Sequence, residues 1–199
     1  MFKEFCKYFN ISEIDENEYQ LSDKLKYVEK TVLGFNDLLN NYQGNLFGKG
    51  LYRLHKDDNI KKWNEIVLEA FPEFKGRIQC FGCDWLGRQF SLDKSRIVDG
   101  IPQIIMFEPD TGEVLEIPCN FIQFHNDEIP NYHDACLASE FFNNWMSMNK
   151  TMLTEQECVG YKVLLFLGGN DTVENLEISD MEVYWSICGQ LIKKTKGLA

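Results

Sequence analysis

The fold prediction depends most on the stretch FGCDWLGRQFSL, residues 81–92. It ends the strand-like segment RIQCFGCDW, residues 77–85, and contains a second strand-like segment, RQFSL, at residues 88–92. Leu86 and Gly87 between the two segments are typical of a turn. The pattern predicts a β-hairpin.

A second hairpin follows directly. The segments PQIIMF (102–107) and EVLEI (113–117) flank a turn at residues 108–112, which has proline early and glycine late. Two consecutive hairpins predict an antiparallel sheet. Further strands are expected at Leu51–Leu54, Tyr161–Leu167 and Glu174–Ile178.

The clearest helix is predicted in DNIKKWNEIVLEAFP, residues 58–72, where apolar residues recur at i, i+3, i+4, i+7 and i+8 from Trp63. Asp58 or Asn59 is expected to cap it and Pro72 to end it. Other helices are expected in a segment that begins near Ser22 and carries Leu25 to Phe35, in Asp37–Tyr42, Cys119–Phe124 and Leu137–Met148, and at the C-terminal end from Val183 to Ile192.

These elements predict an α+β fold, with a central antiparallel sheet of hairpins flanked by helices and a helical N-terminal part. The character of the sequence changes near residue 75, so we expect a helical part at 1–75 and a second part at 76–199. A single compact unit remains the alternative.

The chain is acidic. Its 199 residues include 31 Asp and Glu against 20 Lys and Arg, a formal net charge of −11. Such a surface repels phosphates and favours basic partners, which argues against direct nucleic-acid binding. The alternative is that the acidic composition serves solubility alone and indicates no basic partner.

No apolar run approaches the roughly 18 residues that a membrane helix needs, and the N-terminus lacks the features of a secretory signal. The seven Cys therefore indicate reduced thiols in a cytoplasmic protein.

No sequence signature of catalysis or phosphate binding is found, and no enzymatic activity or cofactor is expected. Cys80 and Cys83 have zinc-ligand spacing and could be completed by His133 and Cys136. Residues three apart on a strand point to opposite faces, however, unless Gly82 makes a turn. We therefore expect packed thiols and no metal.

Acidic side chains gather in two places. Asp127, Glu128 and Asp134 lie between two predicted helices, where a connecting loop often carries binding residues. Glu13, Asp15, Glu16 and Glu18 form the other cluster. A solvated connector is the alternative for each cluster.

Three ordered blocks carry a family resemblance: FGCDWLGRQFSL (81–92), MFEPDTGEVLEIP (106–118) and the long segment from Glu157 to Leu191. Together they resemble the type VI secretion DNase-immunity family, in which a GAD-like N-terminal domain precedes a characteristic C-terminal domain, within the wider SUKH-type class of immunity proteins. The segment NNYQGNLFGKGLYRL (40–54) resembles the GAD-like part more loosely.

The resemblance implies an α+β fold, no enzymatic activity, and a function as an immunity protein that binds and neutralises a toxin, in the best-known branch a DNase. A regulatory or scaffold protein without a toxin partner is the alternative. We predict toxin contacts at Asp127, Glu128, Asp134, Asp84 and Arg88.

For the last two residues a structural role is an alternative, because Asp84 and Arg88 could pair with each other across the hairpin. Trp85 and Trp185 are expected in the core rather than at an interface.

Overall fold

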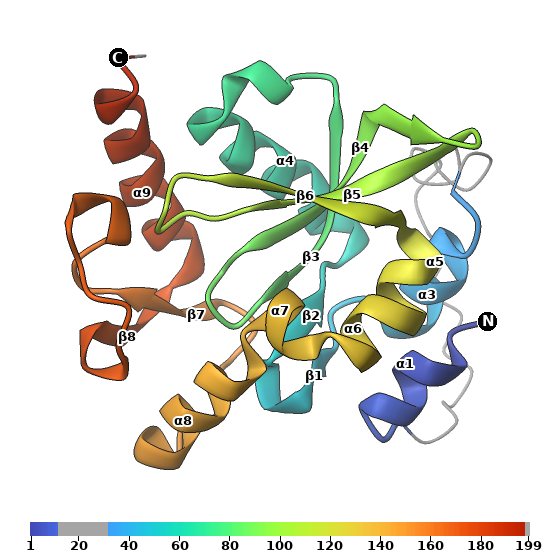
Figure 1. Ribbon diagram of the computed structural model, residues 1–199, viewed down its shortest axis with the longest axis horizontal. Helices are drawn as coiled ribbons and strands as arrows, with labels where there is room; N and C mark the ends of the chain where they lie inside the picture. Colours follow the sequence, from blue (N-terminus) through green and yellow to red (C-terminus); the bar gives the residue numbers. More distant parts are fainter. Residues whose placement is uncertain (12–31, 198–199) are drawn as a thin grey trace.

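The protein is described here by a computed structural model, over residues 1–11 and 32–197 of the chain. A six-stranded antiparallel sheet forms its centre, and its strands follow one another in sequence order (Figure 1). These strands are β1 (Leu46–Phe47), β2 (Tyr52–Leu54), β3 (Ile78–Asp84), β4 (Gln89–Val98), β5 (Ile101–Phe107) and β6 (Val114–Asn120). A separate two-stranded sheet pairs β7 (Glu157–Tyr161) with β8 (Leu176–Asp180).

Helices cover both faces of the central sheet (Figure 1). They are α1 (Lys3–Tyr8), α3 (Phe35–Tyr42), α4 (Asp57–Ala70), α5 (Phe121–Gln123), α6 (Ile129–Asn131), α7 (His133–Leu137), α8 (Ser139–Asn149) and α9 (Met181–Thr195). A π-helical turn over Phe124–Glu128 joins α5 to α6. The α+β class predicted from the sequence, with its central antiparallel sheet, is confirmed.

Strand alternation decides which side chains meet which helices, because neighbouring strand residues point to opposite faces. In β4, the ring of Phe90 packs on Phe124, with ring centres 5.0 Å apart. The preceding residue, Gln89, points the other way, and its Oε1 accepts a hydrogen bond from His55 Nε2 (2.7 Å). Each face of the sheet therefore has its own buried layer.

The first face is covered by α4 and α9, which pack against each other. Phe71 at the end of α4 contacts Phe107 of β5, with ring centres 5.2 Å apart. Gly189 allows the close approach of the two helices, because a Cβ at this position would lie 3.3 Å from Ala70 Cβ. Trp185 of α9 is fully buried in this layer.

The second face is built around His125 in the π-helical turn. Nδ1 of its ring donates to the Phe121 carbonyl (2.8 Å), and Nε2 accepts from Tyr52 Oη (2.9 Å). Five phenylalanine rings surround it, those of Phe2, Phe5, Phe81, Phe121 and Phe124. Burial lowers the pKa of His125 to about 3, so the ring is neutral and the turn is fixed to the sheet.

The β7–β8 sheet is attached to the central sheet through Trp85, directly after β3. The backbone N–H of Trp85 donates to Leu51 O (3.1 Å), and its carbonyl accepts from Val159 N of β7 (2.8 Å). Trp85 is fully buried, as is Trp185, which confirms their predicted place in the core.

Most elements predicted from the sequence are confirmed. Both hairpins, the strand at Leu51–Leu54 and the helices at Asp37–Tyr42, 58–72 and Val183–Ile192 are present with small shifts of their ends. The predicted helix at Leu137–Met148 is divided, because Ala138 has a positive φ of 48° between α7 and α8. The predicted helix after Ser22 and the acidic cluster from Glu13 to Glu18 lie wholly or largely outside the described residues.

Two of the predictions for these elements were wrong. Tyr161–Leu167 is not a strand: β7 ends at Tyr161, and a 3₁₀ turn forms at Leu165–Leu167. The segment forms a loop that contacts the β5–β6 turn, where Phe166 N donates to the Asp110 carbonyl (3.2 Å). The α4 cap is Lys56, without a side-chain cap bond, in place of Asp58 or Asn59.

The central sheet runs across residue 75, because β2 pairs with β3. The division of the chain into 1–75 and 76–199 stays a prediction.

Gly82 provides a test of the packing between β2 and β3. A Cβ at Gly82 would lie 2.5 Å from the Arg53 carbonyl oxygen, whereas Gly76 has open space around it and only a positive φ of 77°. We expect Gly82→Ala to lower the free energy of unfolding by about 3 kcal/mol and Gly76→Ala by about 1 kcal/mol. Urea denaturation measures both, and equal losses would contradict the close packing.

Candidate functional site

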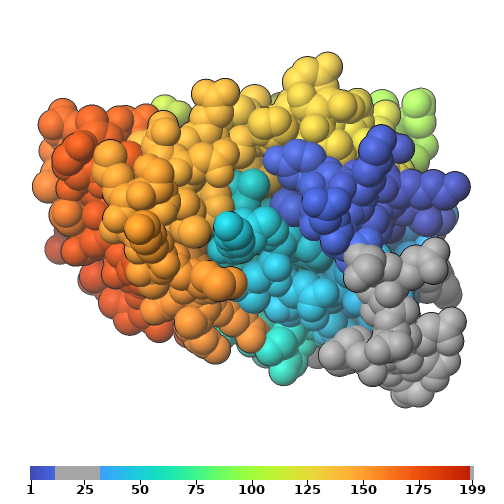
Figure 2. Space-filling view, turned by 90° about the horizontal axis from the view of Figure 1, so that it is seen from below, coloured from blue at the N-terminus to red at the C-terminus, as the bar shows by residue number. Residues whose placement is uncertain are grey.

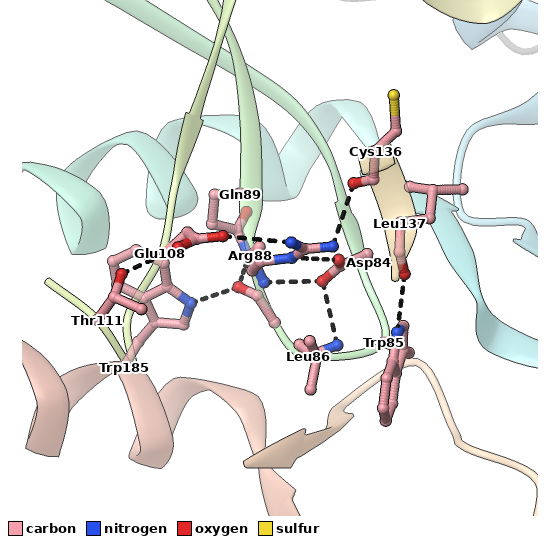
Figure 3. Close-up of polar contacts among 11 residues, drawn as sticks. Asp84, Trp85, Leu86, Arg88, Gln89, Glu108, Thr111, Cys136, Leu137 and Trp185 are labelled. Atoms are coloured by element: carbon pink, nitrogen blue, oxygen red, sulfur yellow. Dashed lines mark hydrogen bonds and ion pairs between the residues drawn. The ribbon is translucent and has the colours of Figure 1, made fainter. Parts of the chain in front are cut away.

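A buried ion pair sits at the turn between β3 and β4. Asp84 Oδ2 accepts from Arg88 Nε (2.6 Å), and Asp84 Oδ1 accepts the backbone N–H groups of Leu86 (3.1 Å) and Arg88 (3.0 Å) (Figure 3). Gly87 occupies the turn with a φ of 78°, a conformation that favours glycine. The sequence Asp-Trp-Leu-Gly-Arg thus closes a turn in which one carboxylate satisfies three donors.

Arg88 extends this pair to two further segments. Its Nη1 donates to Glu108 Oε1 on the β5–β6 turn (3.2 Å), and its Nη2 donates to the Cys136 carbonyl of α7 (3.1 Å). Thr111 Oγ1 donates to the other Glu108 oxygen (2.9 Å). Burial alone lowers the pKa of Arg88, but the carboxylates of Asp84 and Glu108 outweigh burial and raise it. The guanidinium therefore stays charged.

Two buried tryptophans, Trp85 of the turn itself and Trp185 of α9, connect the turn to helices on opposite sides (Figure 3). Trp85 Nε1 donates to the Leu137 carbonyl of α7 (2.9 Å), and Trp185 Nε1 of α9 donates to the Gly87 carbonyl (2.7 Å). Helices on both sides of the sheet are thereby connected to residues 84–88.

Among the predicted partner-binding residues, Asp84 and Arg88 are buried and bonded to each other. Their pairing across the hairpin is the structural role that the sequence analysis gave as the alternative to a partner contact. Their contact with a partner stays a prediction, to which burial lends no support.

The other three predicted residues lie in helical segments, so the loop expected there was wrong. Asp127 belongs to the π-helical turn and is exposed, and its Oδ1 accepts from Asn131 Nδ2 (2.7 Å). Asp134 in α7 is also exposed, and its Oδ1 accepts the N–H of Glu140 at the start of α8 (2.8 Å). Glu128 is half-buried, and burial raises its pKa above the usual value.

This part of the chain forms a continuous surface. Figure 2 shows the segments from about residue 120 to 150, in yellow and orange, side by side along one face of the molecule. Asp127 and Asp134 are exposed residues of these segments, and their role in partner binding stays a prediction.

Next to Asp134 lies a cleft of about 480 Å³ between the β5–β6 turn, the start of α8 and the segment after β7. Its acidic lining residues are Glu108, Asp110, Asp134, Glu140 and Asp171. Among the described residues that line it, Arg88 is the one base. Tyr161 also lines the cleft, and its hydroxyl donates to Asp171 Oδ1 (2.5 Å).

Asp110 is the unusual residue of this acidic cleft. The residue is only 4% exposed, and its Oδ1 has no hydrogen-bond partner within residues 1–11 and 32–197. Burial, together with the neighbouring charge of Glu108, raises the pKa of Asp110 to about 7. Sequence reasoning assigned this residue only to a turn, because nothing in the chain indicates that Asp134, Glu140 and Asp171 come to lie around the same hollow.

The cysteines lie mostly in the core. Cys80, Cys83, Cys119, Cys136, Cys158 and Cys188 are free and buried, and Cys6 is half-buried. The register of β3 against β4 shifts between Cys80 and Gly82. Across residues 1–11 and 32–197, no three His, Cys, Asp or Glu side chains are placed together as metal ligands.

Within the same described ranges, every helix is too short or too polar to cross a bilayer.

The fold and the site define an α+β protein in which a buried ion network supports a carboxylate-lined cleft. Residues 120–192 match the family model described as T6SS immunity protein Tdi1, C-terminal. This match confirms the predicted resemblance to type VI secretion immunity proteins. The GAD-like and SUKH-type assignments stay predictions.

No curated protein matches the chain. Among solved structures, the chain is similar to Atu4351 from Agrobacterium tumefaciens, with a TM-score of 0.62 and 16% sequence identity. The similarity covers 96% of this chain and 89% of that one. At this identity, it concerns the fold alone.

Removal of Arg88 tests the buried network. Arg88→Met leaves Asp84 buried without a counter-ion, so we expect the free energy of unfolding to fall by about 3–5 kcal/mol. Lys61→Met breaks only the exposed Lys61–Glu65 ion pair (3.6 Å). It should change the free energy of unfolding by less than about 0.5 kcal/mol. Similar urea midpoints for the two variants would contradict the role of Arg88.

Asp110 should make stability depend on pH. Its pKa is about 7 in the folded protein against an ordinary value of 3.8, so its contribution is present at low pH and is lost as pH rises through 7. Asp110→Asn removes this loss. We expect the stability of the variant relative to wild type to increase by about 2–3 kcal/mol from pH 5 to pH 8, measured by urea denaturation. A difference that does not change with pH would refute the raised pKa.

Proposed function

We propose that this chain is an immunity protein that binds and neutralises a toxin delivered by a type VI secretion system, and that the toxin is a nuclease with a basic substrate-binding surface. The observation that carries the proposal is the match of residues 120–192 to the T6SS immunity family. That segment contains Asp127, Glu128 and Asp134, as well as the cleft residues Glu140 and Asp171.

The charge of the protein supports a basic partner. A nuclease presents positive charge to the phosphates of its substrate, and an inhibitor with a formal net charge of −11 is attracted to the same surface. Complementary charge accelerates association and fixes the relative orientation of the two proteins. Occupying the substrate surface neutralises the toxin without any chemical step from this chain.

The buried network explains how the surface keeps its shape. Arg88 connects the β3–β4 turn to α7 through the Cys136 carbonyl, and His125 fixes the π-helical turn to β2 through Tyr52. The exposed Asp127 and Asp134 are therefore displayed on supported segments. Binding then requires little ordering of the chain, which favours affinity.

Neutralisation of a lethal enzyme needs a dissociation constant on the order of nanomolar, or about 12 kcal/mol of binding free energy. We expect a stoichiometric complex to co-purify when the chain is co-expressed with the toxin candidate encoded in the neighbouring open reading frame. Calorimetry should show affinity that falls as salt increases. Isolation of the chain alone, with the toxin still lethal, would contradict the function and favour a scaffold role.

Charge reversal then tests the surface region. We expect Asp127→Lys to weaken the complex at least tenfold, about 1.4 kcal/mol, because it places like charges together at the interface. Glu73→Lys makes the same charge change on the exposed turn after α4 and serves as the control. Equal effects of the two variants would show that net charge, and not this surface region, controls binding.

A further inference from the structure

The acidic cleft has a strong excess of negative charge. Five carboxylates line it against one guanidinium, and that guanidinium is already bonded to Asp84 and Glu108. With all groups ionised, the lining carries an excess of four negative charges. A cation that enters the cleft therefore meets carboxylates that no lining base neutralises.

Asp110 contributes a carboxylate oxygen, Oδ1, to which no hydrogen-bond donor in the described part of the chain is bonded. The residue lines the cleft and is more than nine-tenths buried. A buried acceptor left without a hydrogen bond is unfavourable, so a donor that reaches it stabilises it. The unsatisfied group lies beside a hollow of about 480 Å³, within the roughly 300–1,000 Å³ typical of ligand sites.

The walls favour an organic cation over a metal ion. Across the described part of the chain, no three acidic, His or Cys side chains are placed together as metal ligands. Leu86, Phe141 and Leu165 also line the cleft. A lining that combines apolar side chains with carboxylates fits the aliphatic stem and charged head of a long basic side chain.

We infer that the acidic cleft receives one lysine or arginine side chain of the toxin, with Asp110 as the deepest acceptor of its charged head. This inference rests on the proposed function and specifies the anchoring contact within it. Anchors of this kind, a basic side chain in a desolvated hollow, dominate the energetics of many interfaces.

Occupation of the cleft should be coupled to a proton. The titratable and charged groups facing Asp110 are Glu108 on its own turn, Arg88 and Asp84 of the β3–β4 turn, Tyr161 and Asp171 after β7, Asp134 and Glu140 of α7 and α8, and Tyr184 and Cys188 of α9. Arg88 is the one cation among them. A second cation beside Asp110 favours its ionised form, so the bound state holds fewer protons near pH 7.

The test is calorimetry of the toxin complex at pH 6 and pH 8, with wild type, Asp110→Asn and Asp99→Asn. We expect the affinity of wild type to rise about tenfold from pH 6 to pH 8, together with proton release at pH 7 measured in two buffers of different ionisation enthalpy. Asp110→Asn should lose both effects. Asp99, exposed in the β4–β5 turn, is the control, and its variant should behave as wild type.

The outcomes separate the two proposals. A complex that forms with the same pH dependence in wild type and Asp110→Asn overturns the anchoring cleft and leaves the immunity function standing. Absence of any complex with wild type overturns both. Circular dichroism and urea denaturation of Asp110→Asn verify that the variant is folded, so that a loss of the pH effect is assigned to the carboxylate.

Discussion

The buried contact between Asp84 and Arg88 is the constraint on which the rest of the structure depends. Moving two charges out of water is costly, and the attraction between them offsets that cost only when every remaining donor and acceptor is bonded. Here the bonding extends well beyond the pair. Asp84 accepts two backbone N–H groups, and Arg88 donates to Glu108 and to the Cys136 carbonyl. The β3–β4 turn, the β5–β6 turn and α7 therefore have one relative position in which the network is complete.

The same network creates the acidic cleft. Glu108 faces Arg88 on one side, while Asp110, two residues further along the turn, has no ion-pair partner among the described residues, and its Oδ1 has no hydrogen-bond partner there. Because Arg88 is shared between Asp84 and Glu108, it lowers the pKa of Asp110 less than burial and Glu108 raise it. The protein thus stabilises its turn with one guanidinium and leaves the neighbouring carboxylates uncompensated. An unfavourable charge distribution of this kind in the free protein favours a cationic partner.

The sequence predicts local structure well where turn residues or a helical period delimit the segments. Strand-like segments on either side of turn residues were sufficient for the hairpins, and the helical spacing from Trp63 was sufficient for α4. The strand predicted at Tyr161–Leu167 was wrong because a continuous apolar run has no period that distinguishes a strand from a buried loop. Contacts with the β5–β6 turn hold this segment as a loop. The cleft was beyond sequence reasoning for a related physical reason. Asp110, Asp134 and Asp171 belong to three segments that only the folded chain brings together, whereas the possible pairing of Asp84 with Arg88 was foreseeable from their short separation across a turn.

The acidic residues fall into two physical kinds, and the difference matters for neutralising a toxin. Exposed carboxylates such as Asp127 act through the field of the whole surface, which salt screens beyond about 8 Å at physiological ionic strength. In the proposed complex with a toxin, they govern mainly how fast the two proteins meet. In the proposed complex, the buried cleft carboxylates Glu108 and Asp110 act at short range, where screening is weaker, so they govern mainly how long the complex lasts. An inhibitor of a lethal enzyme needs both properties, and supplying them from separate groups lets the outer surface vary without loss of the anchoring contact.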